Sequence, residues 1–210
     1  MKKVLAILMA LMMLASLFGC AAVTPTGEVS ENRLGTIENG VYKNEFFGIT
    51  AKLDADWTIA SEERLAELVG LTADAITDEA ISKQLEESGV AFDLYASTDD
   101  DLTTLNVCIE NIGLLYGAAM DESAYADAAL GNLVTSLESI GLEDVTTEKA
   151  TVPFAGKERV SIAIHATTSG IDFYETLVIL KQGNYIATVT ASSYFKDVSS
   201  DILDNFTAIQ

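Results

Sequence analysis

The sequence predicts an α+β fold, in which helices cover both faces of a mainly antiparallel β-sheet as an α/β/α layered sandwich. Short turns join neighbouring segments of alternating apolar and polar residues, which indicates antiparallel pairing. Segments with helical periodicity lie between the groups of strands. The segment Leu177 to Leu180 is apolar at consecutive positions, which predicts a central strand that is buried on both faces.

Length and charge limit what the protein can be. The 210 residues are enough for one domain that buries a core without a disulfide or a metal. The chain has 12 basic and 32 acidic residues and a net charge of −20. This charge argues against nucleic-acid binding, which depends on neutralising phosphates, and against electrostatic adhesion to anionic lipid. An acidic surface instead keeps a protein soluble and repelled from an anionic envelope.

The first twenty residues predict export and lipidation. Two lysines precede an apolar run over residues 4–18, which is shorter than the ~20 residues of a transmembrane helix. The end of this run resembles a bacterial lipobox, since Leu17 and Gly19 precede Cys20. The resemblance implies a lipoprotein signal peptide over residues 1–19 and acyl chains, including palmitate, on Cys20. The protein would then be anchored to the bacterial cell membrane on its extracytoplasmic side. The alternative is an ordinary signal peptide with a coincidental cysteine.

Residues 20–39 are expected to be the lipidated N-terminus and a flexible tether. They are small and polar, are interrupted by proline and glycine, and follow neither the helical nor the strand period.

Once Cys20 is acylated, only Cys108 remains, so no intramolecular disulfide can form. Cys108 has no basic neighbour that would lower its pKa, so we expect a small buried apolar residue rather than a reactive thiol.

A single folded domain is expected over residues 40–210, and it opens with two strands. The first spans Val41 to Asn44, and apolar residues alternate from Phe47 to Leu53 as a second. A turn at Asp54 to Asp56 then places the only tryptophan, Trp57, in the core. Truncating such a residue typically costs ~3–5 kcal/mol.

Helices and a hairpin are expected next. Ser61 caps a helix that ends at Gly70, and a second helix spans about Thr77 to Ser88. Alternating residues at 90–97 and 104–110 predict two strands joined as a hairpin.

The remainder of the chain predicts a long helix and a strand meander. Residues 113–120 break the period, and Asp121 then caps a helix that continues to Ile140. Further strands are expected over residues 144–152, 160–166, 171–181 and 185–192, followed by a final helix over about 200–206.

The opening of the domain resembles the PsbP-like fold at Tyr42, Asn44, Phe46 or Phe47, Gly48 and Trp57. In that fold an aromatic-glycine hairpin leads through a turn to a tryptophan and then to the first helix. The chain departs from the pattern at residues 53–57, LDADW, where such proteins often carry proline and glycine. Members include a photosystem extrinsic subunit, a Ran-binding protein and bacterial lipoproteins. The resemblance implies a non-catalytic binding scaffold and carries over no functional residue.

Few residues suggest chemistry. His165 is the only histidine, and no sequence pattern links it to a nucleophile, so we expect it to form a surface or sheet-face hydrogen bond. The acidic groups at residues 99–101 and at Asp54 and Asp56 lack the glycine and distal glutamate of an EF-hand loop. We therefore expect solvated turns, with a weak cation site as the alternative, and neither a catalytic residue, a metal site nor a cofactor.

The sequence therefore predicts a membrane-anchored extracytoplasmic lipoprotein that acts as a non-catalytic binding or protein-interaction module. Its partners would be the membrane, through the lipid on Cys20, and an unknown protein or small molecule, with no nucleic acid. The alternative function is a small-molecule carrier or sensor with a cleft between sheet and helices. A hydrolase with dispersed carboxylates is a third hypothesis, supported only by general acidity.

Overall fold

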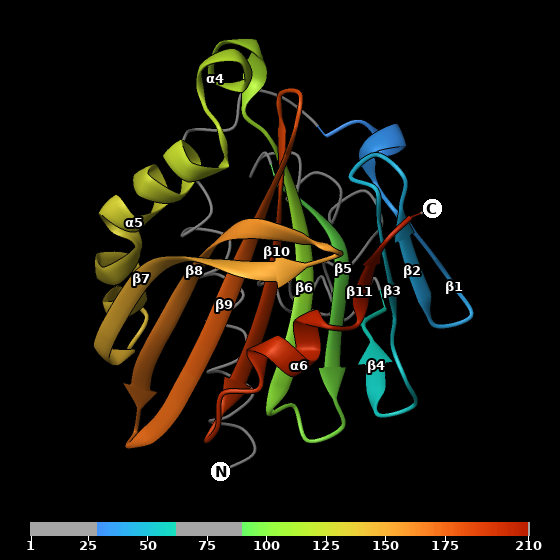
Figure 1. Cartoon of the computed structure of the whole chain (residues 1–210). Helices are drawn as coiled ribbons and strands as arrows, with labels where there is room; N and C mark the ends of the chain where they lie inside the picture. The colour runs from blue at the N-terminus through green and yellow to red at the C-terminus, as the bar shows by residue number, and fades with distance from the viewer. Residues whose placement is uncertain (1–28, 62–89, 210) are drawn as a thin grey trace, which may run out of the picture.

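A computed structural model describes residues 29–61 and 90–209 of the chain as two stacked antiparallel sheets (Figure 1). The smaller sheet has the order β1-β2-β3-β11, and its strands are β1 (Thr36–Glu38), β2 (Val41–Asn44), β3 (Ile49–Lys52) and β11 (Phe206–Ala208). The larger sheet has the order β4-β5-β6-β10-β9-β8-β7. Its strands are β4 (Trp57–Ile59), β5 (Val90–Thr98), β6 (Thr103–Asn111), β7 (Glu143–Phe154), β8 (Lys157–Thr168), β9 (Ile171–Gln182) and β10 (Tyr185–Tyr194).

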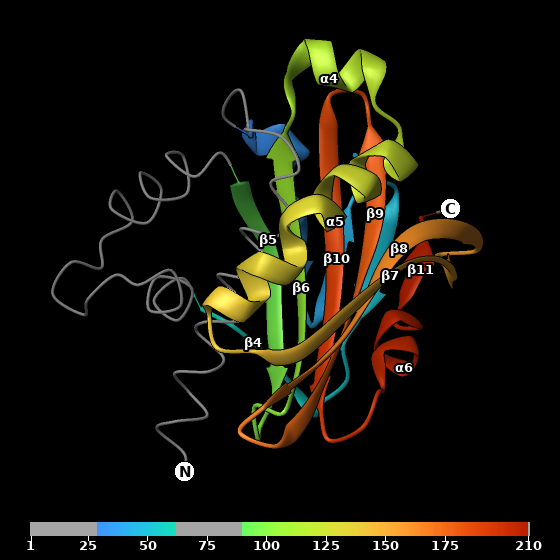
Figure 2. The same cartoon turned by 90° about the vertical axis from the view of Figure 1, so that its left-hand side faces the viewer.

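Helical segments flank these sheets. They are the 3-10 turn η1 (Glu31–Arg33) and the helices α4 (Gly113–Ala119), α5 (Glu122–Ser139) and α6 (Ser199–Leu203). Figure 2 shows α5 lying across one face of the large sheet, with the strands of the small sheet behind that sheet. No helix in residues 29–61 or 90–209 is both long and apolar enough to cross a membrane.

The predicted α+β class with a mainly antiparallel sheet agrees with the structure, but the α/β/α layering is not confirmed. Among the described residues, α5 covers one face of the large sheet, and the small sheet with α6 covers the other. Alternate residues of β9 divide between the two layers: Leu177 and Ile179 face α5, whereas Val178 and Leu180 face the small sheet. The doubly buried strand was therefore predicted correctly, whereas the expected helices on both of its faces are not confirmed.

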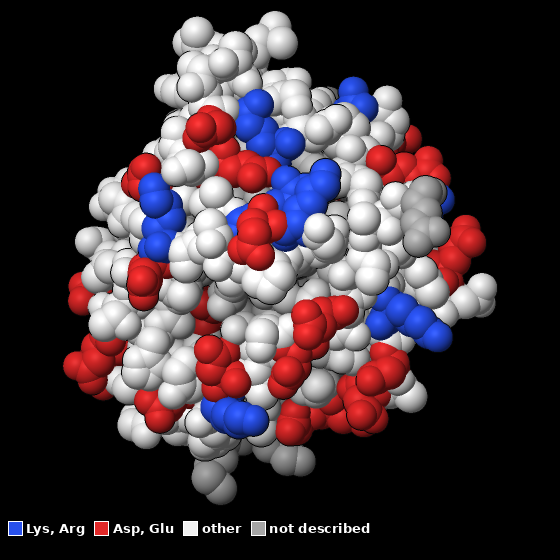
Figure 3. All heavy atoms as spheres, in the orientation of Figure 1, with Lys and Arg blue, Asp and Glu red and all other residues white. Residues whose placement is uncertain are grey.

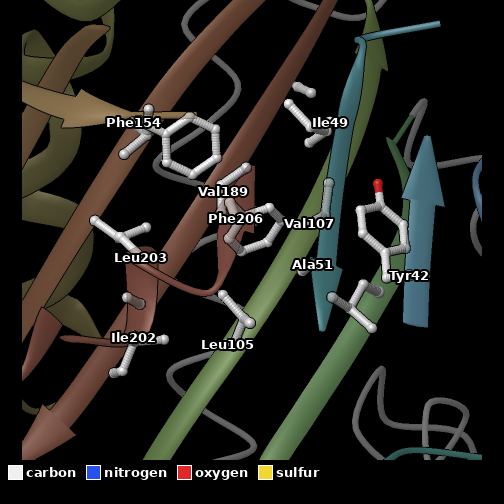
Figure 4. Close-up of a cluster of buried hydrophobic side chains, with 14 of the residues drawn as sticks. Tyr42, Ile49, Ala51, Leu105, Val107, Phe154, Val189, Ile202, Leu203 and Phe206 are labelled. Atoms are coloured by element: carbon white, nitrogen blue, oxygen red, sulfur yellow. The ribbon is translucent and has the colours of Figure 1, made fainter. Parts of the chain in front are cut away.

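The core under the small sheet is a continuous apolar cluster (Figure 4). Phe206 lies at its centre, with its ring 5.1 Å from that of Phe154 and 6.3 Å from that of Tyr42. The backbone of Phe206 pairs with Ala51 in β3. Strands that are far apart in the sequence thus complete this layer. Short strands are stable only when they pair with further strands and bury one apolar face.

The folded chain begins before the expected boundary at residue 40. Strand β1 and the turn η1 lie inside the segment that we expected to be a tether. The residues Asn39 and Gly40 both have positive φ, at 52° and 75°, and join β1 to β2 as a two-residue hairpin. Asparagine-glycine is the preferred sequence for this turn. The dipeptide therefore predicts a hairpin here, although the polar composition of the segment suggests a tether.

Several other elements differ from expectation. Residues 113–119 form α4 rather than an irregular break, and the final helix is shorter and is followed by β11. Trp57 packs against the core under the small sheet but is only partly buried, because the three-residue β4 forms the edge of the large sheet. The signal peptide, the lipobox, Cys20 and the helices expected over residues 61–70 and 77–88 lie outside the described residues.

Candidate functional site

A groove of about 580 Å³ lies on the outer face of the β1–β2 hairpin. Its floor consists of alternate residues of the two strands, with Thr36 opposite Lys43 and Glu38 opposite Val41. These side chains point outward because their neighbours Tyr42 and Asn44 are fully buried on the inner face. The remaining lining residues are Asn32, Leu34, Asn39, Glu45 and Phe46.

One lining residue of the groove, Phe46, belongs to an aromatic cluster. Phe46 meets Phe47 and Tyr185 edge to face, at ring distances of 5.0 and 5.5 Å. The guanidinium of Arg33 lies over the Phe46 ring at 4.2 Å and near the Tyr185 ring at 5.3 Å. Such cation–π contacts hold the aromatic side chains in place. The groove lining therefore combines the apolar side chains of Leu34, Val41 and Phe46 with hydroxyl, amide and charged groups.

Beneath the groove, Asp93 joins the small sheet to the large one. Its carboxylate accepts hydrogen bonds from the Gly35 backbone N–H at 2.6 Å, the Tyr42 hydroxyl at 2.5 Å and Asn44 Nδ2 at 2.7 Å. Asp93 lies where the β5–β6 register shifts between Phe92 and Leu94, and this bulge gives Asp93 no partner across the ladder. Burial raises the pKa of the Asp93 carboxyl, and the three donated hydrogen bonds oppose that rise.

Gly35 is required for this arrangement. A Cβ at that position would lie 2.6 Å from a ring carbon of Tyr42 and 2.8 Å from the Lys43 carbonyl oxygen. Only glycine lets the backbone N–H approach Asp93 so closely. The groove wall is thus a fixed part of the fold.

Two glutamates are buried on the opposite face of the large sheet, under α5. Glu175 is 4% exposed and accepts a hydrogen bond from Ser192 Oγ at 2.7 Å. Burial raises the pKa of Glu175 to about 7, although the Ser192 hydrogen bond opposes this. Burial also raises the pKa of Glu110 well above its usual value. The Tyr125 hydroxyl donates to Glu110 Oε1, while Oε2 has no hydrogen-bond partner within the described residues.

These two carboxyls cannot act together on one substrate. Glu110 pairs with Ile186 and Glu175 pairs with Ser192, six residues further along β10. At ~3.4 Å per residue this places them about 20 Å apart, whereas paired catalytic carboxylates lie within roughly 5–10 Å of each other. Perturbed carboxyl pKa values are typical of functional sites, but buried structural groups also produce them.

His165 forms the sheet-face hydrogen bond expected of it. Its Nε2 lies 3.1 Å from Asp172 Oδ1, and its ring stacks on Tyr174 at 4.8 Å. Cys108 is 2% exposed, as expected for a core residue, and its Sγ lies 3.5 Å from Asn106 Oδ1. Neither residue lines the groove.

The acidic turns are solvent-exposed. Asp100 accepts hydrogen bonds from Thr98 Oγ1 and the Leu102 N–H, which lower its pKa. Asp54 Oδ1 accepts from the Asp56 N–H in the same way. These bonds are local turn contacts. In residues 29–61 and 90–209, no group of three or more acidic, histidine or cysteine side chains is arranged to hold a metal ion.

Sequence reasoning did not find the groove. Its residues belong to the segment that we expected to be a tether and to the outward face of the first strand. The Asn39-Gly40 turn is the one local signal that could have located it.

No family model matches the chain, and no curated protein sequence matches it. Among solved structures, the fold is similar to a protein from Bacteroides thetaiotaomicron, at 8% identity and a TM-score of 0.41. The match covers 83% of this chain and 50% of that protein, so the chain spans half of its length. The fold is also similar to LpqN of Mycobacterium tuberculosis, a protein involved in cell envelope biogenesis, at 13% identity and a TM-score of 0.41. That match covers 76% of this chain and 82% of LpqN.

Similarities at this TM-score carry no argument about function. They also leave the PsbP-like fold unconfirmed.

Proposed function

We propose that the protein is a lipid-anchored extracytoplasmic lipoprotein that acts as a non-catalytic binding module, with the groove on the β1–β2 hairpin as its ligand site. The observation that carries this proposal is the groove itself, a concave site of about 580 Å³ whose lining combines apolar and polar side chains. Sites that bind small molecules and short peptides combine such surfaces in the range of ~300–1,000 Å³.

The ligand best suited to the groove is a short extended peptide. Strand β1 is an edge strand of the small sheet, so its outer backbone groups are placed to pair with an added strand. Every second side chain of the added strand would lie on the groove face beside Thr36, the outward residue of β1. A non-catalytic role is supported by the wide separation of the buried glutamates and by the local partners of His165.

A polar small molecule is the second candidate ligand. It is favoured by the volume of the groove and by the amides of Asn32 and Asn39 in its lining. The groove lies on the outer face of the small sheet, rather than between a sheet and helices where the carrier hypothesis placed its cleft. A carrier or sensor would therefore hold its ligand in an open site.

Thermal unfolding with a panel of short peptides and polar metabolites tests the ligand site. At about a hundredfold its dissociation constant, a ligand adds ~2.7 kcal/mol of stability, or roughly 5–10 °C in midpoint for a domain of this size. Thr36→Trp would fill the groove floor and should abolish the shift. Thr207→Trp is the matched control, because Thr36, Lys43, Thr50 and Thr207 form one row across the sheet and Thr207 lies at its far edge.

A shift that survives Thr36→Trp would contradict the proposed site, and no shift with any member of the panel would argue for a protein partner.

Anchoring is tested separately. Cys20→Ser should move the full chain from the membrane fraction to the soluble fraction, and unchanged detergent partitioning would refute lipidation.

A further inference from the structure

An exposed apolar surface lies on α4. Leu114 is 84% exposed, Leu115 79% and Tyr116 41%. Residues 112–120 contain no charged side chain in a protein with 32 acidic residues. The protrusion at the top of the space-filling view, where α4 lies in Figure 1, is uncharged (Figure 3). Adjacent large apolar side chains at such exposure mark a surface that meets a partner or a membrane.

The backbone of α4 is held firmly in this position. Ile112, which precedes it, is fully buried, and the Ile112 N–H donates to the Asn184 carbonyl at 2.9 Å. Asn184 Nδ2 donates to Asn111 Oδ1 at 2.8 Å. Gly117 packs so closely that a Cβ there would lie 2.7 Å from Asn184 Cα. The leucines are therefore directed outward by a fixed helix that rests on the β9–β10 turn.

The described chain starts at the same end of the molecule. Arg33 contacts Tyr185, which directly follows the turn that supports α4. Figures 1 and 2 both place η1 and α4 at this end of the large sheet. Val29 lies four positions before Arg33 and nine positions after Cys20. A chain of that length spans at most ~30 Å, so a lipid on Cys20 would hold this end close to the bilayer.

We propose that α4 is a second membrane contact, which inserts Leu114, Leu115 and Tyr116 into the headgroup–acyl interface of the bilayer that holds the lipid on Cys20. The inference rests on the proposed lipid anchor. A bilayer is the favoured occupant because the surface combines aliphatic side chains with a tyrosine, whose ring and hydroxyl suit the interface. The uncharged stretch also brings no acidic group to a membrane that repels the rest of the protein.

This contact would orient the domain. A lipid chain alone leaves the domain free to tumble on its tether, whereas a second contact fixes which surfaces face outward. With α4 and η1 toward the membrane, the groove on the β1–β2 hairpin would open sideways near the bilayer surface. The ligand would then be captured close to the envelope.

Tryptophan quenching in vesicles tests the contact. The lipidated full-length protein carries Trp57→Phe, so that Tyr116→Trp provides the only tryptophan, and it is reconstituted into phosphatidylcholine–phosphatidylglycerol vesicles. Spin-labelled phospholipids should quench this tryptophan several-fold more than they quench Phe195→Trp in the same background. Phe195 is 60% exposed and follows the opposite end of β10, roughly 30 Å away. Labels near the headgroup should quench more than labels near the chain end, since interfacial residues lie only ~5–10 Å deep.

Four outcomes separate the possibilities. Strong quenching at position 116 that Leu114→Glu with Leu115→Glu abolishes supports the contact. Equal, weak quenching at positions 116 and 195 in protein that floats with vesicles overturns the contact and leaves the lipid anchor standing. Failure to float overturns the anchor and with it this inference. A blue shift at position 116 that depends on protein concentration without vesicles would assign the surface to a second copy of the chain and overturn the membrane contact.

Discussion

The two faces of the large sheet hold their buried acids in different ways. On the face under the small sheet, Asp93 accepts three hydrogen bonds from groups of the other sheet and its flanking chain. On the face under α5, Glu175 accepts a hydrogen bond from Ser192, and Glu110 accepts one from Tyr125. Asp93 connects the two sheets through three donors and Glu110 connects the large sheet to α5 through one donor, whereas Glu175 and Ser192 both belong to the large sheet.

This difference separates two uses of a buried carboxyl. A carboxylate that receives several donors can remain charged and fix the position of those donors. A buried carboxyl with a single donor keeps its proton to a higher pH, because burial disfavours the charge. The small-sheet face therefore gains a specific connection from its acid, and the α5 face gains a sensitivity to pH.

The largest effect is expected in the apolar part of the small-sheet face. Phe206→Ala removes the ring between Phe154 and Tyr42 and should lower the free energy of unfolding by about 3–5 kcal/mol. Chemical denaturation measures the loss. Leu133→Ala on α5 is the comparison variant for the other face, with an expected loss of about 2–5 kcal/mol. A loss below 1 kcal/mol for Phe206→Ala would mean that the small sheet is not packed as a core layer.

The next effect is the pH dependence caused by Glu175. Its pKa is about 7 in the folded protein and near 4.5 when unfolded, so between these values the folded state holds the proton more tightly. Stability from this group is fully present below pH 4.5 and is lost as the pH rises to 7. The loss should be about 3 kcal/mol, at 1.36 kcal/mol per pKa unit.

Glu175→Gln supplies the control, because it keeps the shape and the acceptor for Ser192 but cannot ionise. Unfolding curves measured at several pH values should show the decline in the wild type relative to the variant. Parallel stability profiles for the two proteins would show that the Glu175 carboxyl remains ionised when buried.

A smaller effect is expected at Asp93. Asp93→Asn keeps the volume but places an amide N–H₂ among three donors, so at least one buried donor loses its acceptor. We expect a loss of about 2 kcal/mol in the free energy of unfolding. Asp99→Asn at the exposed hairpin tip should change stability by less than about 0.5 kcal/mol. If the two variants were equal in urea denaturation, Asp93 would not connect the sheets.

The sequence predicted the large sheet better than the small one for a physical reason. Strands β8, β9 and β10 are long and are joined by short turns, and β8 alternates while β9 carries a continuous apolar run, so local patterns determine their pairing. The small sheet combines β1, β2 and β3 with β11, which lies about 160 residues further along the chain. No local pattern pairs Phe206 with Ala51, because only the shared core brings them together.

The candidate site could not be predicted from the sequence, because it too depends on contacts between residues that are far apart in the chain. Thr36, Lys43 and Asn32 are ordinary polar surface residues in the sequence, and they become a groove because Asp93 fixes Gly35 and Tyr42 below them. The bulge that frees Asp93 from its ladder is likewise invisible in a period-two pattern. His165 and Cys108 were predicted correctly because their surroundings are set by their own strands.

The smallest effect is expected at Asp121, the exposed N-cap of α5. Asp121 is exposed and caps α5 by accepting a hydrogen bond from the Ala124 N–H at 2.8 Å. Asp121→Ala should cost about 1 kcal/mol, the usual value of an N-cap, and Asp121→Asn should be close to neutral because asparagine caps equally well. Thermal or urea unfolding of both variants measures this.

Because α5 is also held by its buried stripe of Tyr125, Ala129, Leu133 and Leu137, one lost cap leaves most of its packing intact. The small sheet has short strands and depends more on a single acid. Asp121→Ala should therefore cost less than Asp93→Asn. If the order were reversed, exposed local capping would stabilise its layer more than a buried carboxylate with three donors, and the contrast between the two faces would fail.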